Sequence, residues 1–292
     1  MEFSSKQLLY LEIVNKKGTL AAAANELEIT QPALSSAISE LERKIGLQLF
    51  EKKGRRKVLT ASGQLVTEFA KETLYRAREL SELLSIDNQG IGGSLRIGMI
   101  DAASLYLLPT AIEAFKNETP DIKLYITVND SDTLTEQLEN FEIDIAFVVS
   151  KDENSLPHSR LISTLILEES LLLCNPIANK ETPMKEWALY PDKSRTRALI
   201  DEGIQALELE PNTIVQSSNP QILRQLVALG LATSILPEQV AKENKNIHVG
   251  REIARRRITA LRRANSPFDP KVASLISLAL QVYNRIEARP SP

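Results

Sequence analysis

Residues 19 to 47 contain two short runs of apolar side chains at helical spacing, separated by a turn at about residues 28–30. The first run shares one helix face and consists of Leu20, Ala23, Ala24 and Leu27. The second run forms one stripe of Leu34, Ile38, Leu41 and Ile45. Apolar side chains three and four residues apart predict amphipathic helices. Thr19 and Thr30 are the expected N-caps, and Pro32 is tolerated in a first turn, where a missing N–H loses no helical bond.

Short side chains surround the start of the second predicted helix and the face opposite its stripe. The candidate DNA-contacting residues here are Thr30, Gln31, Pro32, Ser35, Ser36, Ser39 and Arg43. Such side chains fit a major groove, where Gln pairs with an adenine edge and Ser offers a donor or an acceptor. The pattern is typical of a helix-turn-helix that reads DNA. An ordinary helical hairpin with a solvated serine face stays open as the alternative on this segment alone.

A third helix is predicted upstream. Ser4 and Gln7 match a capping box behind Phe3, and the helix that they open ends at Gly18. Its inward side chains are Leu8, Leu11 and Val14. The sequence therefore predicts a three-helix unit.

Residues 49–60 predict a basic hairpin with Gly54 at its tip. Lys53, Arg55 and Arg56 are its candidate DNA contacts, because a basic tip beside a recognition helix binds phosphates or enters a minor groove. A solvated charged turn is the alternative. Residues 1–60 contain ten Lys and Arg against seven Asp and Glu, whereas the rest of the chain contains twenty-five against thirty-one. The positive charge thus coincides with the predicted DNA-reading unit.

A longer motif connects these elements. It is AAAANELEITQPALSSAISELERKIGLQLFEKKGRR, followed by KVLTASG and a long helix. Looser motifs follow in order: SLRIGMI, LYLLPTAIEAF, IDIAFVV, YPDKSRTR and QILRQLVALGLATSILPE. On these residues nearly the whole chain resembles the LysR-type transcriptional regulators. The resemblance implies an all-α winged helix-turn-helix domain at 1–60, double-stranded DNA and RNA polymerase as partners, and self-association into dimers and often tetramers.

The pattern from Thr60 to about Leu84 is helical without interruption. Side chains at coiled-coil spacing form a thin seam of Val66, Ala70, Thr73, Ala77, Leu80 and Leu84. We expect this helix to pair two subunits, because residues 87–94 (DNQGIGGS) predict a flexible joint and leave the helix no obvious partner in its own chain. A lone helix packed on its own domain is the alternative. The linker helix and hinge are placed at 61–89.

Strands and helices alternate after residue 90, which is typical of an α/β fold with a parallel sheet. The first strands are SLRIGMI, IKLYITV and IDIAFVV, with helices at 106–117 and 132–140 between them. A second set follows from about residue 161 to 261, and a C-terminal helix at 270–286 returns to the first half. The resemblance implies an effector domain at 90–292 with two lobes like those of periplasmic binding proteins. Lobe I is placed at about 90–161 and 266–292, and lobe II at about 162–265.

Ligands of such sheets bind at the carboxyl ends of strands, near helix N-termini that favour anions. In lobe I this rule selects Asp101, Ala102, Ala103, Ser104, Asn129, Asp130 and Ser131. In lobe II it selects Ser194, Arg195, Thr196, Ser217, Ser218 and Asn219. Each Ser or Asn by itself is more often a plain N-cap, so the prediction rests on their convergence. The expected effector is an organic anion or an amino acid, with any amine facing Asp101 or Asp130.

Other features argue against an enzyme. His158 and His248 are the only histidines, their spacing is not that of metal ligands, and no nucleophile elbow, phosphate loop or dinucleotide motif occurs. We therefore expect no cofactor and no metal. Cys174 is the single cysteine and lies in an apolar run, which predicts burial and excludes an internal disulfide switch.

No apolar run is long enough for a membrane span, and no signal peptide precedes the first helix, so a cytoplasmic protein is expected. A solute-binding or sensing protein without a transcriptional role is the alternative function, although it would have no use for a basic reading unit. The arginines that bracket ITAL, which are Arg255, Arg256, Arg257, Arg262 and Arg263, are interpreted as a solvated edge or a subunit contact. A second nucleic-acid surface is the lesser alternative for this cluster.

Overall fold

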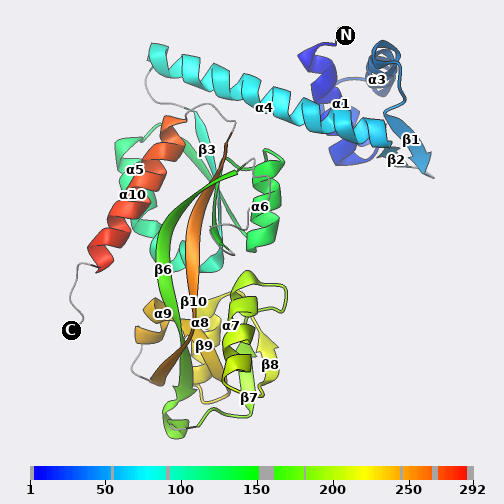
Figure 1. Cartoon of the computed structure of the whole chain (residues 1–292). Helices are drawn as coiled ribbons and strands as arrows, with labels where there is room; N and C mark the ends of the chain where they lie inside the picture. The colour runs from blue at the N-terminus through cyan, green and yellow to red at the C-terminus, as the bar shows by residue number, and fades with distance from the viewer. Residues whose placement is uncertain are drawn as a thin grey trace. The chain divides into compact units, whose positions relative to one another are not determined.

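The computed structural model describes residues 3–53, 56–89, 93–150, 161–180, 182–243, 246–264 and 269–287. The chain divides into two compact units, residues 1–90 and residues 91–292 (Figure 1). The elements of the first unit are α1 (Ser5–Lys17), α2 (Leu20–Glu26), α3 (Gln31–Ile45), β1 (Phe50–Lys53), β2 (Arg56–Leu59) and α4 (Ala61–Gln89). The three short helices and the hairpin thus have the order that the sequence predicts.

Side-chain caps set the helix ends of the first unit. Ser4 and Gln7 form the predicted capping box, with Ser4 Oγ accepting from Gln7 N at 3.2 Å. Thr19 and Thr30 cap α2 and α3, and Thr60 Oγ1 accepts from Gly63 N at the start of α4. The predicted apolar faces meet in one core, which buries Leu11, Val14, Ala23, Ala24, Leu34, Ile38 and Leu41. Caps and stripes are local signals, which is why these helices were predicted correctly.

The first half of α4 packs on its own chain. Ala70 is fully buried in the core of the first unit, and Val66 packs against that core. The predicted pairing seam is therefore wrong at these two positions, because they pack in the core of their own unit. Leu80 and Leu84 are exposed, as an intersubunit seam requires. The helix also continues through Gln89, into the segment predicted as a flexible joint.

The described part of the second unit is built on an eight-stranded sheet with the order β4-β3-β5-β10-β6-β9-β7-β8. Its strands are β3 (Ser94–Met99), β4 (Lys123–Val128), β5 (Ile145–Val149), β6 (Leu161–Pro176), β7 (Glu186–Leu189), β8 (Asn212–Gln216), β9 (Thr233–Pro237) and β10 (Ile247–Arg263). Its helices are α5 (Pro109–Glu118), α6 (Ser131–Glu139), α7 (Arg195–Ala206), α8 (Pro220–Ala228), α9 (Glu238–Lys242) and α10 (Pro270–Glu287), with short turns at Ala103–Leu107 and Ile177–Asn179. β3 pairs in parallel with β4 and β5, as the alternating pattern predicts.

The two long antiparallel strands β6 and β10 run through both lobes (Figure 1). In lobe I they contribute Leu167 and Ile258 to a core that also includes α5, α6 and α10. In lobe II they contribute Leu171 and Ile253 to a second core beneath α7 and α8. These two strands thus form a ribbon that crosses between the lobes, and each of them changes core near its middle. The ladder shifts register on β10 between Val249 and Ala254 and again after Ile258.

The interpretation of the arginine cluster as a solvated edge is wrong. β10 lies between β5 and β6 in the sheet, so it is a central strand. Arg256 is 1% exposed, and the buried Arg263 Nη1 donates to the carbonyls of Leu138 and Ile143. Arg257 Nε instead donates to Glu168 Oε2 on β6 at 2.8 Å. Successive arginines therefore alternate between buried and more exposed positions, because successive strand residues face opposite sides.

Two smaller expectations also need correction. The helix predicted at 106–117 is divided into the π-helical turn Ala103–Leu107 and α5, which begins at Pro109. The helix predicted from Arg197 begins two residues earlier, at Arg195. α7 lies so close to β10 that a Cβ on Gly203 would come within 2.2 Å of the Ile253 carbonyl oxygen. The absent side chain at Gly203 therefore permits the close packing of α7 on β10.

Candidate functional site

The first unit presents the predicted DNA-reading residues at the start of α3. Gln31, Ser36 and Ser39 are exposed, together with Thr30 and Pro32, whereas Ser35 is half-buried. Arg43 lies two turns further along α3, where its guanidinium donates two hydrogen bonds to Glu40, at 2.8 and 2.6 Å. Arg43 therefore already has an anionic partner on its own helix. A free face of short polar side chains remains at the N-terminal end of α3, as major-groove reading requires.

A carboxylate fixes the hairpin to α3. Glu42 Oε1 accepts from the backbone N–H groups of Leu49 and Phe50, at 2.9 and 3.2 Å, so the first strand leaves α3 in one direction. Lys53 is exposed at the end of β1. Gly54 and Arg55 lie outside the described residues, and Arg56 begins β2. Sequence reasoning did not identify Glu42, whose acceptor role depends on a turn that brings residues seven positions apart together.

The second unit contains a cavity of about 430 Å³ between its lobes. It is lined by many of the residues selected from strand ends: Asp101, Ala102, Asn129, Asp130, Ser131, Ser194, Thr196 and Ser218. They come from the loops after β3 and β4 in lobe I and from the starts of α7 and α8 in lobe II. The convergence expected from the strand-end rule is therefore present.

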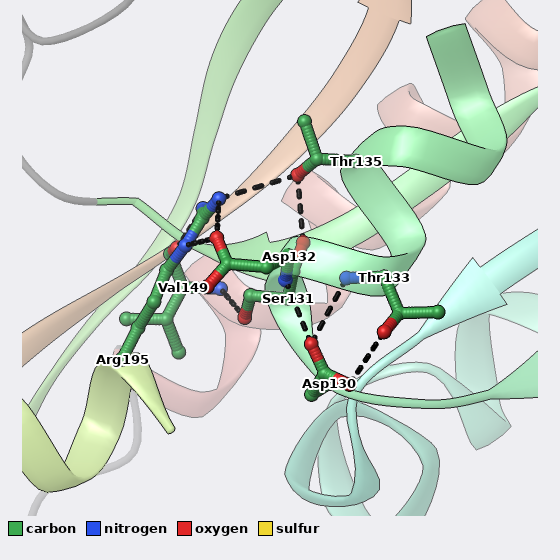
Figure 2. Close-up of polar contacts among 7 residues, drawn as sticks. All are labelled: Asp130, Ser131, Asp132, Thr133, Thr135, Val149 and Arg195. Atoms are coloured by element: carbon green, nitrogen blue, oxygen red, sulfur yellow. Dashed lines mark hydrogen bonds and ion pairs between the residues drawn. The ribbon is translucent and has the colours of Figure 1, made fainter. Parts of the chain in front are cut away.

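The other selected residues do not line this cavity. Ala103 is buried in the lobe I core, and Ser104 Oγ donates to the Asp101 carbonyl within its own turn. Ser217 Oγ accepts from Asn219 N, and Asn219 Oδ1 caps α8 by accepting from Gln221 N. These side chains have the cap and turn roles that the sequence left as alternatives. Arg195 points into lobe I, where it contacts α6 and β5 (Figure 2).

The cavity also has lining residues that the sequence did not select. They are Ile100, Val128, Val149, Tyr190, Pro191, Lys193 and Arg256. Tyr190 and Lys193 precede the selected Ser194 in the same loop, so extending the strand-end rule by four residues would have found them. Arg197 Nη1 fixes that loop by donating to the Tyr190 carbonyl at 2.9 Å. Arg256 could not be found in this way, because its position depends on the central placement of β10.

Arg256 is the centre of a buried polar network beneath the cavity. Its Nε donates to Glu169 Oε1 at 2.8 Å, its Nη1 to Thr196 Oγ1 at 3.1 Å and its Nη2 to the Tyr106 hydroxyl at 2.8 Å. The network joins lobe I through Tyr106, the crossing strands through Glu169, and lobe II through Thr196. A guanidinium has five N–H groups, so two donors remain beyond these three bonds. Arg256 also lines the cavity, and its side chain is 1% exposed.

Two buried tyrosines adjoin this guanidinium. Burial raises the pKa of Tyr190 to about 12, although the charge of Arg256 opposes the shift. Burial likewise raises the pKa of Tyr106 well above its ordinary value. Both hydroxyls therefore stay protonated at neutral pH. The Tyr190 hydroxyl makes no hydrogen bond with any described residue, and neither does Glu169 Oε2.

The two acidic residues of the cavity differ in whether their carboxylates cap a helix. Both carboxylate oxygens of Asp130 are used at the start of α6, where Oδ1 accepts from Asp132 N and Thr133 N and Oδ2 accepts from the Thr133 hydroxyl (Figure 2). Burial raises the pKa of Asp130, but these hydrogen bonds outweigh it and leave the pKa below its ordinary value. Asp130 is thus an N-cap held in its charged form. Asp101 lines the cavity without such a capping role.

Comparison with known proteins identifies the domains. Residues 5–64 match the model of "Bacterial regulatory helix-turn-helix protein, lysR family". Residues 88–284 match the model of "LysR substrate binding domain". The chain belongs to the LysR family. This LysR-family chain is a transcriptional regulator with a DNA-binding helix-turn-helix domain and an effector-binding domain, and the family is one of regulators rather than enzymes.

Two relatives are similar in sequence to this LysR-family chain over most of its length. It is 26% identical over 263 residues to the uncharacterized HTH-type transcriptional regulator YeiE of Escherichia coli strain K12, covering 87% of each chain. It is 27% identical over 246 residues to the hydrogen peroxide-inducible genes activator of Haemophilus influenzae, covering 80% of this chain and 79% of that one.

Solved structures show the same fold. Full-length OxyR from Pseudomonas aeruginosa superposes with a TM-score of 0.69 at 21% identity, covering 96% of this chain and 98% of that one. Full-length CbnR in a complex with its target DNA has a TM-score of 0.64 at 22% identity, covering 96% of this chain and 100% of that one. In the described residues of the LysR-family chain, none of the helices combines the length and the apolar character that a bilayer crossing requires.

Proposed function

We propose that this regulator is controlled by a small organic anion that binds in the cavity between its lobes. The observation that carries the proposal is the buried Arg256, which lines the cavity with two N–H donors beyond its three hydrogen bonds. A buried guanidinium binds a carboxylate or phosphate through short, charge-assisted hydrogen bonds. Lys193 adds a second positive charge to the lining.

The start of α7 supports the same ligand class. Ser194 is the N-cap of α7, yet its side chain makes no capping hydrogen bond. The first-turn N–H groups of α7 therefore lack a side-chain acceptor, and the positive end of the helix dipole faces the wall of the cavity formed by Ser194 and Thr196. An anionic group placed there would satisfy these donors.

An amino acid is the more specific candidate. Its ammonium group would face Asp101, which lines the cavity. Asp130 is less suitable, because both of its oxygens already cap α6. The expected orientation is thus a carboxylate at Arg256 and α7 with an amine at Asp101.

A thermal-shift panel of amino acids, organic acids and sugar phosphates on the full chain tests this proposal. A ligand at a hundred times its dissociation constant adds about 2.7 kcal/mol, or about 5–10 °C for a unit of this size. Lys193→Gln should weaken the shift, whereas Lys185→Gln, outside the cavity lining, should not. Stabilisation by neutral apolar compounds alone would contradict the proposal.

The DNA side of the proposal rests on α3. We infer that Gln31, Ser36 and Ser39 read base edges, that the basic hairpin binds phosphates, and that the exposed part of α4 pairs two subunits, which assemble further into tetramers. The protein would then act on promoters in the cytoplasm, together with RNA polymerase. The effector would alter regulation by binding one arrangement of the assembly better than another.

Membership of a family of transcriptional regulators excludes the alternative of a sensing protein without a transcriptional role. The exposed polar face of α3 favours the regulator, because it has no use in a solute binder. Operator selection from random DNA tests the proposed reading face, since a sequence-specific reader enriches one sequence at fixed salt.

A further inference from the structure

Arg195 makes four hydrogen bonds across the cleft (Figure 2). It is the first residue of α7 in lobe II, and all of its partners belong to lobe I. Nε and Nη2 donate to Asp132 Oδ1 at 2.9 and 2.6 Å, and Nη1 donates to the Val149 carbonyl at 2.8 Å. A longer bond of 3.4 Å joins Nη2 to Thr135 Oγ1. The guanidinium thus joins α7 to both α6 and the end of β5.

The partners of Arg195 are neighbours of the cavity lining. Ser194 and Thr196 flank Arg195 in the sequence, and Ser131 precedes Asp132; all three line the cavity. Val149 ends β5 in lobe I and itself lines the cavity; its N–H donates to Ser131 Oγ at 3.1 Å, and its carbonyl accepts from Arg195. The contact therefore connects the two walls of the cavity, although Arg195 is not part of the lining.

The position of Arg195 is unfavourable for α7 alone. A cation in the first turn of a helix is repelled by the positive end of the helix dipole, whereas Asp132 is favoured in the first turn of α6. The two hydrogen bonds to Asp132 Oδ1 compensate for this arrangement only when the two lobes are close together. A helix-start arginine of this kind thus gains its partner through closure of the cleft.

We propose that Arg195 is a positioning residue, which latches the start of α7 to lobe I and thereby sets the width of the effector cavity. The effect on the effector rests on the proposed function, whereas the effect on the lobes does not. The latch is reversible, because the Asp132 side chain is 60% exposed and exposed ion pairs are weak. A weak contact of this kind shifts the balance of open and closed lobes without preventing either.

Distances between the lobes test the latch directly. Spin labels at Glu139→Cys on α6 and Glu202→Cys on α7, both exposed positions, report the separation in the full chain diluted with unlabelled protein. The buried Cys174 stays unlabelled. We expect Arg195→Gln and Asp132→Asn each to raise the population of longer distances about fivefold, and the double variant to match either single variant. Arg195→Lys keeps the positive charge but loses the planar guanidinium with its several donors, so it should give a partial effect.

The matched control is Arg251→Gln, an exposed arginine on β10 outside the cavity lining, which should leave the distances unchanged. Unchanged distances in Arg195→Gln, or additive effects in the double variant, would overturn the latch.

The ligand panel then separates the two proposals. Any anion that stabilises the parent protein should bind about fivefold more weakly to both Arg195→Gln and Asp132→Asn. Longer distances without any anion hit would support the latch and contradict the proposed effector class. An anion hit of equal affinity in the parent and in both variants would overturn the role of Arg195 in effector binding.

Discussion

The Tyr106 hydroxyl donates a 2.7 Å hydrogen bond to Glu169 Oε1, which joins the π-helical turn of lobe I to the crossing strand β6. Arg256 donates to both of these oxygens, so the three side chains form a closed polar triangle beneath the cavity. Every edge of the triangle is buried or partly buried, and a buried hydrogen bond that loses one partner leaves the other group desolvated. The triangle is therefore expected to contribute to stability as well as to position Arg256.

Tyr106→Phe tests this contribution. The substitution removes one donor to Glu169 and one acceptor for Arg256 while keeping the ring, so we expect the free energy of unfolding to fall by about 1–3 kcal/mol. Urea unfolding of the full chain provides the measurement. Tyr125→Phe is the matched control, because Tyr125 is 56% exposed. An equal loss for both variants would contradict a specific role of the triangle.

Gln31→Ala tests the reading face of α3. If Gln31 pairs with an adenine edge, its loss should weaken operator binding by about 1–3 kcal/mol and leave binding to unrelated DNA nearly unchanged. Arg55→Ala or Arg56→Ala should instead weaken binding to all sequences and flatten its salt dependence. Binding at several fixed salt concentrations separates the two classes, with the exposed Gln64→Ala on α4 as the control. An unchanged operator affinity for Gln31→Ala would remove this residue from the reading set.

Paired substitutions on α4 test the subunit contact. Glu at both Ala77 and Leu80, which are exposed, should place like charges across the helix pair and split the dimer without unfolding the first unit. Ala70→Glu should destabilise the first unit itself, because Ala70 is fully buried there. Sedimentation and circular dichroism together distinguish these results. A dimer that persists in the double Glu variant would show that the exposed part of α4 is not the contact.

Cys174 yields a prediction for alkaline pH. Burial raises its pKa from 9.0 to about 12, so the unfolded chain releases this proton first as the pH rises. Stability should therefore be retained below about pH 9 and fall between about pH 9 and 12. Between pH 8 and 10 the parent protein should lose more stability than Cys174→Ala, as measured by urea unfolding. Equal losses would contradict a buried, neutral thiol.

Local signals explain most of what the sequence predicted correctly. The cap at Thr30 and the stripe of Leu34, Ile38 and Leu41 depend on neighbours within one or two turns, so they define α3 without any knowledge of the fold. The end of a parallel strand is also a local feature, which is why the sequence predicts a common site for Asp101 and Ser194, and both line the cavity.

Positions that depend on long-range packing were not predicted. Ala70 has the spacing of a pairing seam, but it packs in the core of its own unit, and spacing alone does not distinguish a partner helix from the same chain or another. Arg256 lies in a run of charges that resembles a solvated edge, and only the place of β10 between β5 and β6 shows that it is buried. Arg195 was selected as a ligand contact for its position, whereas its direction depends on Asp132, 63 residues away.

The crossing ribbon of β6 and β10 has a mechanical consequence for the lobes. Two antiparallel strands joined by a long ladder resist bending, so rotation of the lobes is expected to twist this ribbon. Ladder irregularities lie on β10 between Val249 and Ala254 and after Ile258, on either side of Arg256. Bulges interrupt the ladder and increase local twist, so we expect the ribbon to deform most easily there. The resistance to rotation of one lobe against the other thus depends on two short stretches of β10, and the buried guanidinium of Arg256 lies between them.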